Sequence, residues 1–152
     1  MKLNFSFLII IFLFLQQCGY APVYLNIKDK NINLNIVEIS GNDTMNAILH
    51  TNIKKYQNKQ AQTNINLIVK TNYKKNILTK NKAGKATSYS ITKKIEFEIT
   101  NLENVQKYLF EEETKTSSMV SEFEFKNYER TIVTNFIDTK LEELLYKLPN
   151  DK

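Results

Sequence analysis

Residues 89–99, YSITKKIEFEI, have the clearest periodicity in the chain. One face of this segment is apolar apart from a single lysine, and it comprises Tyr89, Ile91, Lys93, Ile95, Phe97 and Ile99. The opposite face carries hydroxyl and charged groups, namely Thr92, Lys94, Glu96 and Glu98. Alternation with a period of two predicts a β-strand that is buried on one side only. We therefore expect a sheet with one face in the core and the other in water.

Similar segments flank this strand on both sides. Upstream, a second strand is predicted from the alternation of Ile65, Leu67, Val69, Thr71 and Tyr73 with Asn66, Ile68, Lys70 and Asn72. Downstream, residues 105–116 predict a strand with Tyr108 and Phe110 on one face and Glu111 and Glu113 on the other. Residues 76–85 are polar and basic, with Gly84 indicating a hairpin-like loop, and residues 101–104 predict a turn. Short connections between consecutive strands favour an antiparallel meander.

A strand and a helix are predicted before the meander. In residues 32–39, Ile32, Leu34, Ile36 and Glu38 alternate with Asn33, Asn35, Val37 and Ile39, and a turn is expected at residues 40–43. Asp43 or Thr44 can cap the helix that follows, because a side-chain oxygen there accepts a free backbone N–H. The helix is expected to end near Asn58, with one apolar face formed by Met45, Ile48, Leu49, Ile53 and Tyr56.

A long helix is predicted from about Asn127 to Leu148. Its apolar stripe consists of Ile132, Phe136, Ile137, Leu141, Leu144, Leu145 and Leu148. Pro149 is expected to stop it, and Lys147 near its end suits the helix dipole. The order strand–helix–strand–strand–strand–helix predicts an α+β fold. We expect a two-layer sandwich, in which two helices cover one face of a four-stranded, mostly antiparallel sheet.

The first 24 residues have a different character. Lys2 precedes an apolar run, Phe5–Leu15, and the only cysteine, Cys18, follows shortly after. A run of eleven residues is shorter than the roughly 20 that span a bilayer, and it matches the h-region of a signal peptide. The segment resembles a bacterial lipoprotein signal, with Leu15 three positions before Cys18, although Gln17 departs from the small residue preferred there. The alternative is an ordinary signal peptide or an uncleaved anchor in which Cys18 is incidental.

The lipoprotein interpretation divides the chain. Residues 1–17 would be the signal peptide, Cys18 the lipid attachment site and residues 18–31 a lipidated tether. Residues 32–149 would form a single α+β domain, followed by a tail at 150–152. A lone cysteine forms no intramolecular disulfide, and acylation, for example with palmitate, would remove the free thiol. The net charge of +5 is compatible with an anionic ligand or membrane surface.

The residues after Cys18 connect the chain to a known family. Gly19–Tyr24, GYAPVY, resembles the CGF/Y-x-P-L-Y opening of the LptE family, the outer-membrane lipoproteins of lipopolysaccharide assembly. Gly84–Tyr89, GKATSY, resembles a G-x-A-T-R/S-Y turn of alphaproteobacterial members, and Asn127–Arg130, NYER, is similar to the entry of the family's C-terminal helix. The order of elements and the length are also similar, so the resemblance covers essentially the whole mature chain.

The resemblance implies a non-enzymatic function. Members of the family lie as a plug inside a large outer-membrane β-barrel, the lipopolysaccharide translocon LptD. They assist its assembly and contact lipopolysaccharide on its way to the outer leaflet. The implied location is therefore the periplasmic side of the outer membrane, with a lipid anchor and no cofactor. The alternative is a stand-alone periplasmic lipoprotein that binds a lipid or a peptidoglycan fragment.

Residues that could perform catalysis or bind metal are sparse. His50, the only histidine, has no second histidine or cysteine partner, so we expect a structural or solvent role and no metal site. In Glu111-Glu112-Glu113, adjacent side chains on a strand point to opposite faces, which favours a solvated edge over a catalytic pair. Glycine occurs only at positions 19, 41 and 84, so no phosphate-binding loop is present. We therefore expect that the protein is not an enzyme.

Basic residues gather between the second and third strands. The candidates for contact with lipopolysaccharide phosphates, or with acidic loops of a barrel, are Lys74, Lys75, Lys80, Lys82 and Lys85. The alternative is a solvated hairpin without a ligand. No aromatic residue lies between positions 74 and 85, which argues against binding to single-stranded nucleic acid.

Overall fold

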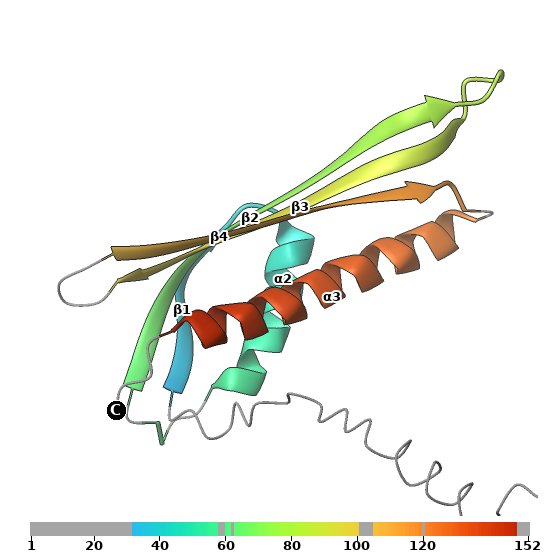
Figure 1. Cartoon of the computed structure of the whole chain (residues 1–152). Coiled ribbons are helices and arrows are strands. Elements are labelled where there is room, and N and C mark those ends of the chain that lie inside the picture. Colours follow the sequence, from blue (N-terminus) through green and yellow to red (C-terminus); the bar gives the residue numbers. More distant parts are fainter. Residues whose placement is uncertain (1–31, 58–59, 62, 101–104, 120, 149–152) are drawn as a thin grey trace, which may run out of the picture.

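The structure, a computed structural model, describes residues 32–57, 60–61, 63–100, 105–119 and 121–148. The signal peptide, Cys18, the tether, Pro149 and the tail lie outside the described residues. The described elements are β1 (Ile32–Ser40), α2 (Asp43–Ile53), a 3₁₀-helix (Lys54–Tyr56), β2 (Thr63–Lys80), β3 (Ala86–Thr100), β4 (Val105–Ser117) and α3 (Glu122–Lys147). They confirm the predicted α+β class and the βαβββα order. Both helices lie on the same side of the sheet (Figure 1).

The sheet has the strand order β1-β2-β3-β4 within the described residues. β1 and β2 are parallel, because α2 carries the chain back across the sheet between them. β2, β3 and β4 pair antiparallel, as the short connections predict. The sheet is therefore mostly antiparallel, with β1 and β4 at its two edges.

The core lies between the inner face of the sheet and the two helices. The predicted alternation on β2 and β3 is confirmed, because Leu67, Val69, Ile95 and Phe97 are fully buried there. On the helices, the buried side chains of the core cluster are Met45, Leu49, Ile53, Val133, Phe136, Ile137, Leu141, Leu144 and Leu145. Lys93 is the exception in this layer, since it is fully buried on the same face as its apolar neighbours.

A bulge in β1 alters one part of the predicted pattern. The pairing with β2 shifts between Ile36 and Glu38, and Val37 is 62% exposed. A bulge inserts one residue, so the side chains beyond it change faces. Ile39 consequently packs against the core and Glu38 is exposed, which makes the predicted core-facing position of Glu38 wrong.

The hairpin between β2 and β3 is longer than predicted. Residues 76–80 were expected in a loop, but they belong to β2, and only Asn81–Lys85 form the turn. Polar cross-strand contacts replace apolar ones here, because the Thr79 hydroxyl lies 2.7 Å from that of Thr87 and 2.6 Å from that of Ser88. Figure 1 shows this hairpin reaching past the N-terminal end of α3.

The helix boundaries differ from the prediction because other residues cap them. The Asn42 side chain accepts the Met45 N–H at 3.0 Å, so Asn42 is the cap of α2, not Asp43 or Thr44. α2 and its 3₁₀ extension end at Tyr56, before the predicted Asn58. α3 begins at Glu122 instead of Asn127, because the Ser121 hydroxyl accepts the Glu124 N–H. Neither described helix is long and apolar enough to cross a membrane.

Candidate functional site

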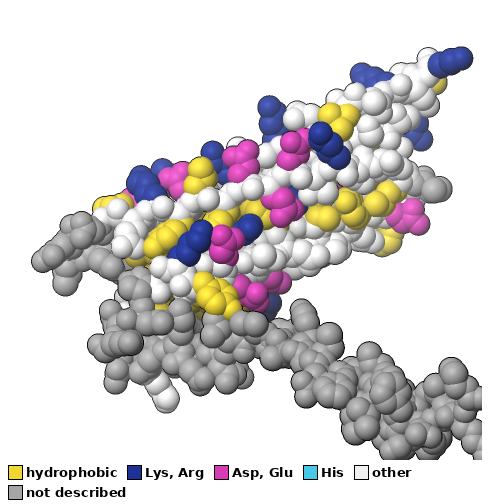
Figure 2. Space-filling model, viewed as in Figure 1, with side chains coloured by type: hydrophobic (Ala, Val, Ile, Leu, Met, Phe, Trp, Pro, Cys, Tyr) yellow, Lys and Arg dark blue, Asp and Glu magenta, His cyan; other side chains and the backbone are white. Residues whose placement is uncertain are grey.

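The end of the β2–β3 hairpin carries most of the predicted basic residues. We define Leu78–Thr87 as the hairpin tip. Lys80, Lys82 and Lys85 lie in it, and all three are exposed. Within the described residues, these ammonium groups form no ion pair. The sequence contains no acidic residue from position 44 to position 95, so no carboxylate neutralises the hairpin locally. Figure 2 shows dark blue side chains at this end without magenta ones beside them.

The turn of the hairpin tip is built by Asn81. Its side-chain oxygen accepts the N–H groups of Ala83 and Lys85, each at 3.0 Å. Gly84 has a φ of +77°, a conformation that residues with a Cβ rarely adopt. These contacts hold the chain reversal in place, so Lys82 and Lys85 project from a defined turn and Lys80 from the end of β2 that leads into it.

Lys74 and Lys75 point to opposite faces of β2, because adjacent residues on a strand alternate. Lys74 is exposed on the outer face of the sheet. Lys75 turns inward, where its ammonium lies 2.8 Å from the Glu129 carboxylate of α3. It also lies 4.9 Å from the ring centre of Phe125 and 5.7 Å from that of Tyr89. All five predicted lysines are exposed, but they differ in pairing: among the described residues Lys75 is paired with Glu129, and the other four form no ion pair.

Glu129 also accepts a hydrogen bond from the Tyr73 hydroxyl, at 2.5 Å. Burial and then this contact with a carboxylate raise the pKa of Tyr73 well above its ordinary value. We call Tyr73, Lys75 and Glu129 the hairpin clamp, because they connect β2 to the first half of α3. The clamp holds the base of the hairpin against the helix.

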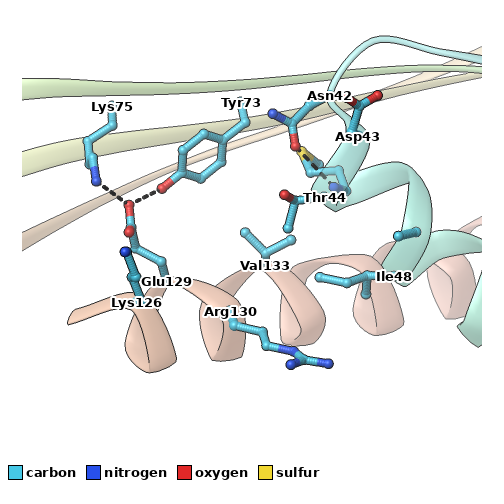
Figure 3. Close-up of a pocket in the computed structure, with 12 residues that line it drawn as sticks. Asn42, Asp43, Thr44, Ile48, Tyr73, Lys75, Lys126, Glu129, Arg130 and Val133 are labelled. Carbon is cyan, nitrogen blue, oxygen red and sulfur yellow. Dashed lines mark hydrogen bonds and ion pairs between the residues drawn. The ribbon is translucent and has the colours of Figure 1, made fainter. Parts of the chain in front are cut away.

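A groove lies beside the hairpin clamp, between the start of α2 and the first half of α3. Its volume is about 690 Å³. Met45, Ile48 and Val133 supply apolar side chains, and the polar lining includes Asp43, Lys126 and Arg130. Figure 3 shows the clamp at one end of this α2–α3 groove, with Arg130 directed away from the sheet. Within the described residues, the Arg130 guanidinium forms no ion pair.

The start of α2, at the edge of the groove, is fixed by Thr71. The Thr71 hydroxyl accepts the Asn42 N–H at 2.9 Å and donates to the Asn46 side chain at 2.7 Å. Gly41 makes the close approach possible, since a Cβ there would lie 1.8 Å from the Thr71 carbonyl oxygen. The groove is therefore bordered by a rigid turn on this side.

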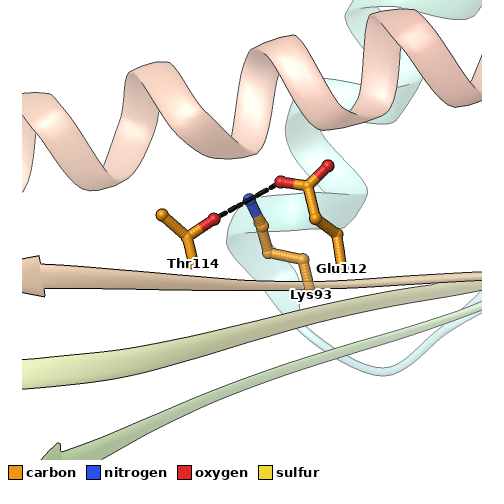
Figure 4. Close-up of polar contacts among 3 residues, drawn as sticks. All are labelled: Lys93, Glu112 and Thr114. Atoms are coloured by element: carbon orange, nitrogen blue, oxygen red, sulfur yellow. Dashed lines mark hydrogen bonds and ion pairs between the residues drawn. The ribbon is translucent and has the colours of Figure 1, made fainter.

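An ion pair with one buried partner, Lys93, lies under the middle of α3. The Lys93 ammonium donates to the Glu112 carboxylate and to the Thr114 hydroxyl, the latter at 2.9 Å (Figure 4). It also lies 5.5 Å from the ring centre of Phe136 on α3. The Lys93 side chain is 1% exposed, whereas that of Glu112 is 47% exposed. Glu112 compensates the charge of Lys93, the lysine that is fully buried on the inner face of the sheet, so the pair has a structural role.

The remaining candidates of the sequence lie apart from these sites. Glu112 faces inward while Glu111 and Glu113 face outward, so the three carboxylates do not converge. His50 is exposed on α2. Within the described residues, no group of three His, Cys, Asp or Glu side chains is placed to hold a metal ion.

Comparison with known proteins shows that this chain is similar in fold to solved structures of lipoproteins. No family model and no curated protein matches the sequence. The crystal structure of rare lipoprotein B from Shewanella oneidensis is similar, with a TM-score of 0.50 and 11% identity over 72% of this chain and 93% of that chain. The chain has an LptE-like fold.

A second structure, the solution structure of an uncharacterized lipoprotein B from Nitrosomonas europaea, has a TM-score of 0.42 and 12% identity. It covers 76% of this chain and 83% of that chain, and it is too distant to support an argument. The LptE-like fold agrees with the family resemblance of the sequence, so that resemblance is confirmed as a likeness in fold.

Sequence reasoning missed Tyr73, Glu129 and Arg130 as site residues, and it named Lys75 as a lipopolysaccharide contact, not as a partner of Glu129. Glu129 and Arg130 belong to the NYER segment, but nothing in that pattern indicates which strand residues they meet. The only available signal was the period of two on β2, which places Tyr73 and Lys75 on the same face.

Proposed function

We propose that this protein is a lipid-anchored, non-catalytic plug and scaffold of the outer-membrane lipopolysaccharide translocon. In this role it assists assembly of the LptD barrel and the insertion of lipopolysaccharide into the outer leaflet. The observation that carries the proposal is an LptE-like fold that begins at Ile32, 14 residues after Cys18, the last residue of a lipoprotein-like segment. The lipid on Cys18 would hold the domain at the periplasmic side of the membrane that contains the barrel.

The hairpin tip supports a contact with phosphate groups. Lys80, Lys82 and Lys85 are exposed and lack internal carboxylate partners among the described residues, so their charges are available to an anion. The exposed Lys74 extends this basic surface along β2. Lys75 contributes less, because its ammonium is already paired with Glu129. Lipid A phosphates are the anions that such a protein would meet at the outer membrane.

Depletion of the protein in its own cells tests the function. We expect an LptD barrel that fails to assemble and lipopolysaccharide that accumulates before the outer leaflet. Wild-type protein supplied from a plasmid should restore both, and a Cys18→Ala variant should restore neither, because it lacks the anchor. Normal barrel assembly and normal surface lipopolysaccharide after depletion would contradict the proposal.

The phosphate contact is tested separately. Replacement of Lys80, Lys82 and Lys85 by Glu should weaken binding of the full chain to lipopolysaccharide at low salt, where charge screening is smallest. Replacement of Lys54, Lys55 and Lys70 by Glu is the control that matches the change in net charge. These three lysines are also exposed, but they lie away from the hairpin tip. Equal binding by the tip variant and the wild type would exclude the hairpin tip as the contact.

The α2–α3 groove is the observation that favours the alternative, a stand-alone ligand-binding lipoprotein. Its apolar lining and the Arg130 guanidinium could hold a small amphiphile with an anionic head. The two functions make different predictions for Arg130→Ala. The alternative predicts that depletion leaves barrel assembly normal and that Arg130→Ala weakens binding of the full chain to an anionic amphiphile. The translocon role predicts that Arg130→Ala still restores barrel assembly in the depleted cells.

A further inference from the structure

β1 forms one edge of the sheet, and among the described residues no strand pairs with its outer side. Its first part, Ile32–Ile36, pairs with β2 in a regular register, and the bulge at Val37 ends this regular part. A regular edge strand presents unpaired backbone N–H and C=O groups to which a further strand can bind. The regular part of β1 can therefore accept a short strand.

The inner face of this edge has apolar side chains that are incompletely covered. Ile32 and Ile36 are only half-buried, although both pack against the core. Leu67, which is paired with Ile36 on β2, is fully buried. Apolar side chains of a strand beside β1 would complete the burial of the two isoleucines.

The outer face of the same edge is polar. The Asn33 amide donates to the Asn64 side chain at 2.8 Å, and the Asn35 amide donates to the Asn66 side chain at 3.3 Å. Asparagine thus lies beside asparagine on this face. A strand added at the edge should carry polar side chains here and apolar side chains on the inner face.

The sequence directly before β1 has this alternation. Residues 23–27, VYLNI, are followed by four polar residues, KDKN, and then by INLNI at 32–36. Residues 23–31 lie outside the described residues. A hairpin with its turn at 28–31 would run the two apolar segments antiparallel. The opposed residues would be Ile27 and Ile32, Asn26 and Asn33, Leu25 and Leu34, Tyr24 and Asn35, and Val23 and Ile36.

This register keeps both faces of the sheet. The three apolar pairs fall on the inner face, and the other two continue the polar row on the outer face. A shift by one residue would oppose asparagine to isoleucine and turn Leu25 outward. A shift by two would oppose Ile27 to Lys30 in one direction, and Tyr24 to the bulged Val37 in the other. Residues 28–31 also suit a turn, because Asp and Asn are favoured there.

We propose that residues 23–27 form an additional strand, antiparallel to β1 and paired with Ile32–Ile36, which extends the sheet at this edge. The segment that binds the edge is this one because it matches both faces of β1 and a four-residue turn is enough to bring it there. The inference does not depend on the proposed function, since it needs only the edge and the sequence before it.

The additional strand would determine the position of the lipid anchor. Ile32 follows Cys18 by 14 residues, and a free chain of that length spans up to about 46 Å. With residues 23–27 held on β1, only the chain from Cys18 to Val23 remains free, and it spans about 17 Å. An acylated Cys18 would therefore be held close to Ile36, which fixes the side of the domain that lies nearest the membrane.

Cross-linking of introduced cysteines tests the register. The full chain, acylated on Cys18, is purified in mild detergent with one of two cysteine pairs introduced. Tyr24→Cys and Asn35→Cys are directly opposed in the proposed register, at a distance that a disulfide bridges. Tyr24→Cys and Asn33→Cys are diagonal and too far apart. Oxidised glutathione should therefore close the 24–35 pair at least about tenfold faster than the 24–33 pair.

A segment that does not bind β1 predicts the opposite order. It would close the 24–33 pair at least as fast as the 24–35 pair, because the loop between 24 and 33 is shorter. Equal or faster closure of the 24–33 pair would overturn the proposal. Circular dichroism establishes that the domain is folded in both variants.

Two further variants of the 24–35 protein form a matched comparison. Leu25→Asp and Asn26→Asp each add one carboxylate, but residue 25 would face the core and residue 26 would face water. Leu25→Asp should slow closure of the disulfide about tenfold, because it removes an apolar side chain from the inner face. Asn26→Asp should leave the rate unchanged, and equal effects of the two changes would overturn the proposal.

Hydrogen exchange of the wild-type protein is an independent measurement that needs no variant. Alternate backbone N–H groups of an edge strand point away from the sheet, so an unpaired edge exchanges them fast. The proposal predicts slow exchange at every amide of Ile32–Ile36. Fast exchange at alternate positions would overturn it.

Discussion

Removing the charge of Glu112 should destabilise the fold more than removing its partner, the buried Lys93. Breaking a fully buried ion pair by loss of one partner costs about 3–5 kcal/mol, because the other charge remains buried without compensation. Here Glu112 is 47% exposed, so water reaches the site in part, and Thr114 still accepts from the ammonium. We therefore expect Glu112→Gln to lower the free energy of unfolding by about 1–2 kcal/mol.

Lys93→Met should have a much smaller effect. Methionine fills a similar volume beneath Phe136, and Glu112 can be hydrated once its partner is gone. Replacement of a buried charge by an apolar group of similar size is commonly neutral or stabilising, so we expect a change within about 1 kcal/mol. The double variant should resemble Lys93→Met alone, because Glu112 has no buried charge left to compensate.

Thermal and denaturant unfolding monitored by circular dichroism measure these differences. The loss for Glu112→Gln corresponds to a melting temperature lower by about 4–8 °C in a domain of this size. Glu111→Gln is the control, since that carboxylate is exposed and lies 3.9 Å from Lys94, and it should change stability by less than about 0.5 kcal/mol. The reasoning is refuted if Lys93→Met destabilises more than Glu112→Gln, or if Glu112→Gln and Glu111→Gln are equivalent.

Three further predictions concern the framework around the site. Gly41→Ala should lower the free energy of unfolding by at least about 2 kcal/mol, because its Cβ would collide with a backbone carbonyl. Gly84→Ala meets open space and should lower it by about 1 kcal/mol, the cost of a positive φ alone. Denaturant unfolding measures both, and equal losses would contradict the reasoning. Ser121→Ala should remove about 1 kcal/mol, since it deletes the cap of α3, and an unchanged melting temperature would exclude that role. The raised pKa of Tyr73 means that the folded state keeps a proton that the unfolded chain loses above pH 10, so stability should fall as pH rises beyond 10. The stability of the Tyr73→Phe variant should fall less steeply above pH 10, and parallel curves of stability against pH for the two proteins would show that Tyr73 makes no such contribution.

The sequence predicted the layers of the fold because both periodicities were clean. The alternation at 89–99 and the apolar stripe of the last helix place most of the same side chains in the core as the structure does. The helix stripe was wrong at one turn, because Ile132 is only half-buried and its neighbour Val133 takes the core position. The alternation also predicted correctly that Lys93 lies on the core face, because it falls in step with Ile91 and Ile95. Its partner was not predicted, because the register that opposes Lys93 and Glu112 depends on pairing between strands, which no local pattern encodes.

The errors have local physical causes. Polarity alone suggested that residues 76–80 form a loop, but a strand that projects beyond the helices has no core to face and can be polar on both sides. Three neighbouring residues can cap α2, and the choice of Asn42 depends on the contact with Thr71 from a distant strand. The start of α3 was predictable, because Ser121 and Glu124 have the spacing of a capping box.

The candidate site was predictable only in part. The lysines of the hairpin tip could be named from composition, and the structure adds that Lys82 and Lys85 lie in one ordered turn directly after Lys80 at the end of β2. The inward turn of Lys75 follows from strand alternation, but its pairing with Glu129 requires the packing of α3 against β2. Long-range contacts of this kind are the part that one sequence cannot specify.

Purification of the intact protein from its own outer membranes tests the central claim most directly. The protein is extracted in mild detergent through an affinity tag at its C-terminus, and the copurifying proteins are identified by mass spectrometry. The account predicts one large outer-membrane β-barrel in a stoichiometric complex, recovered with the wild type and lost with Cys18→Ala. Recovery of the lipidated wild-type protein without any β-barrel would contradict it.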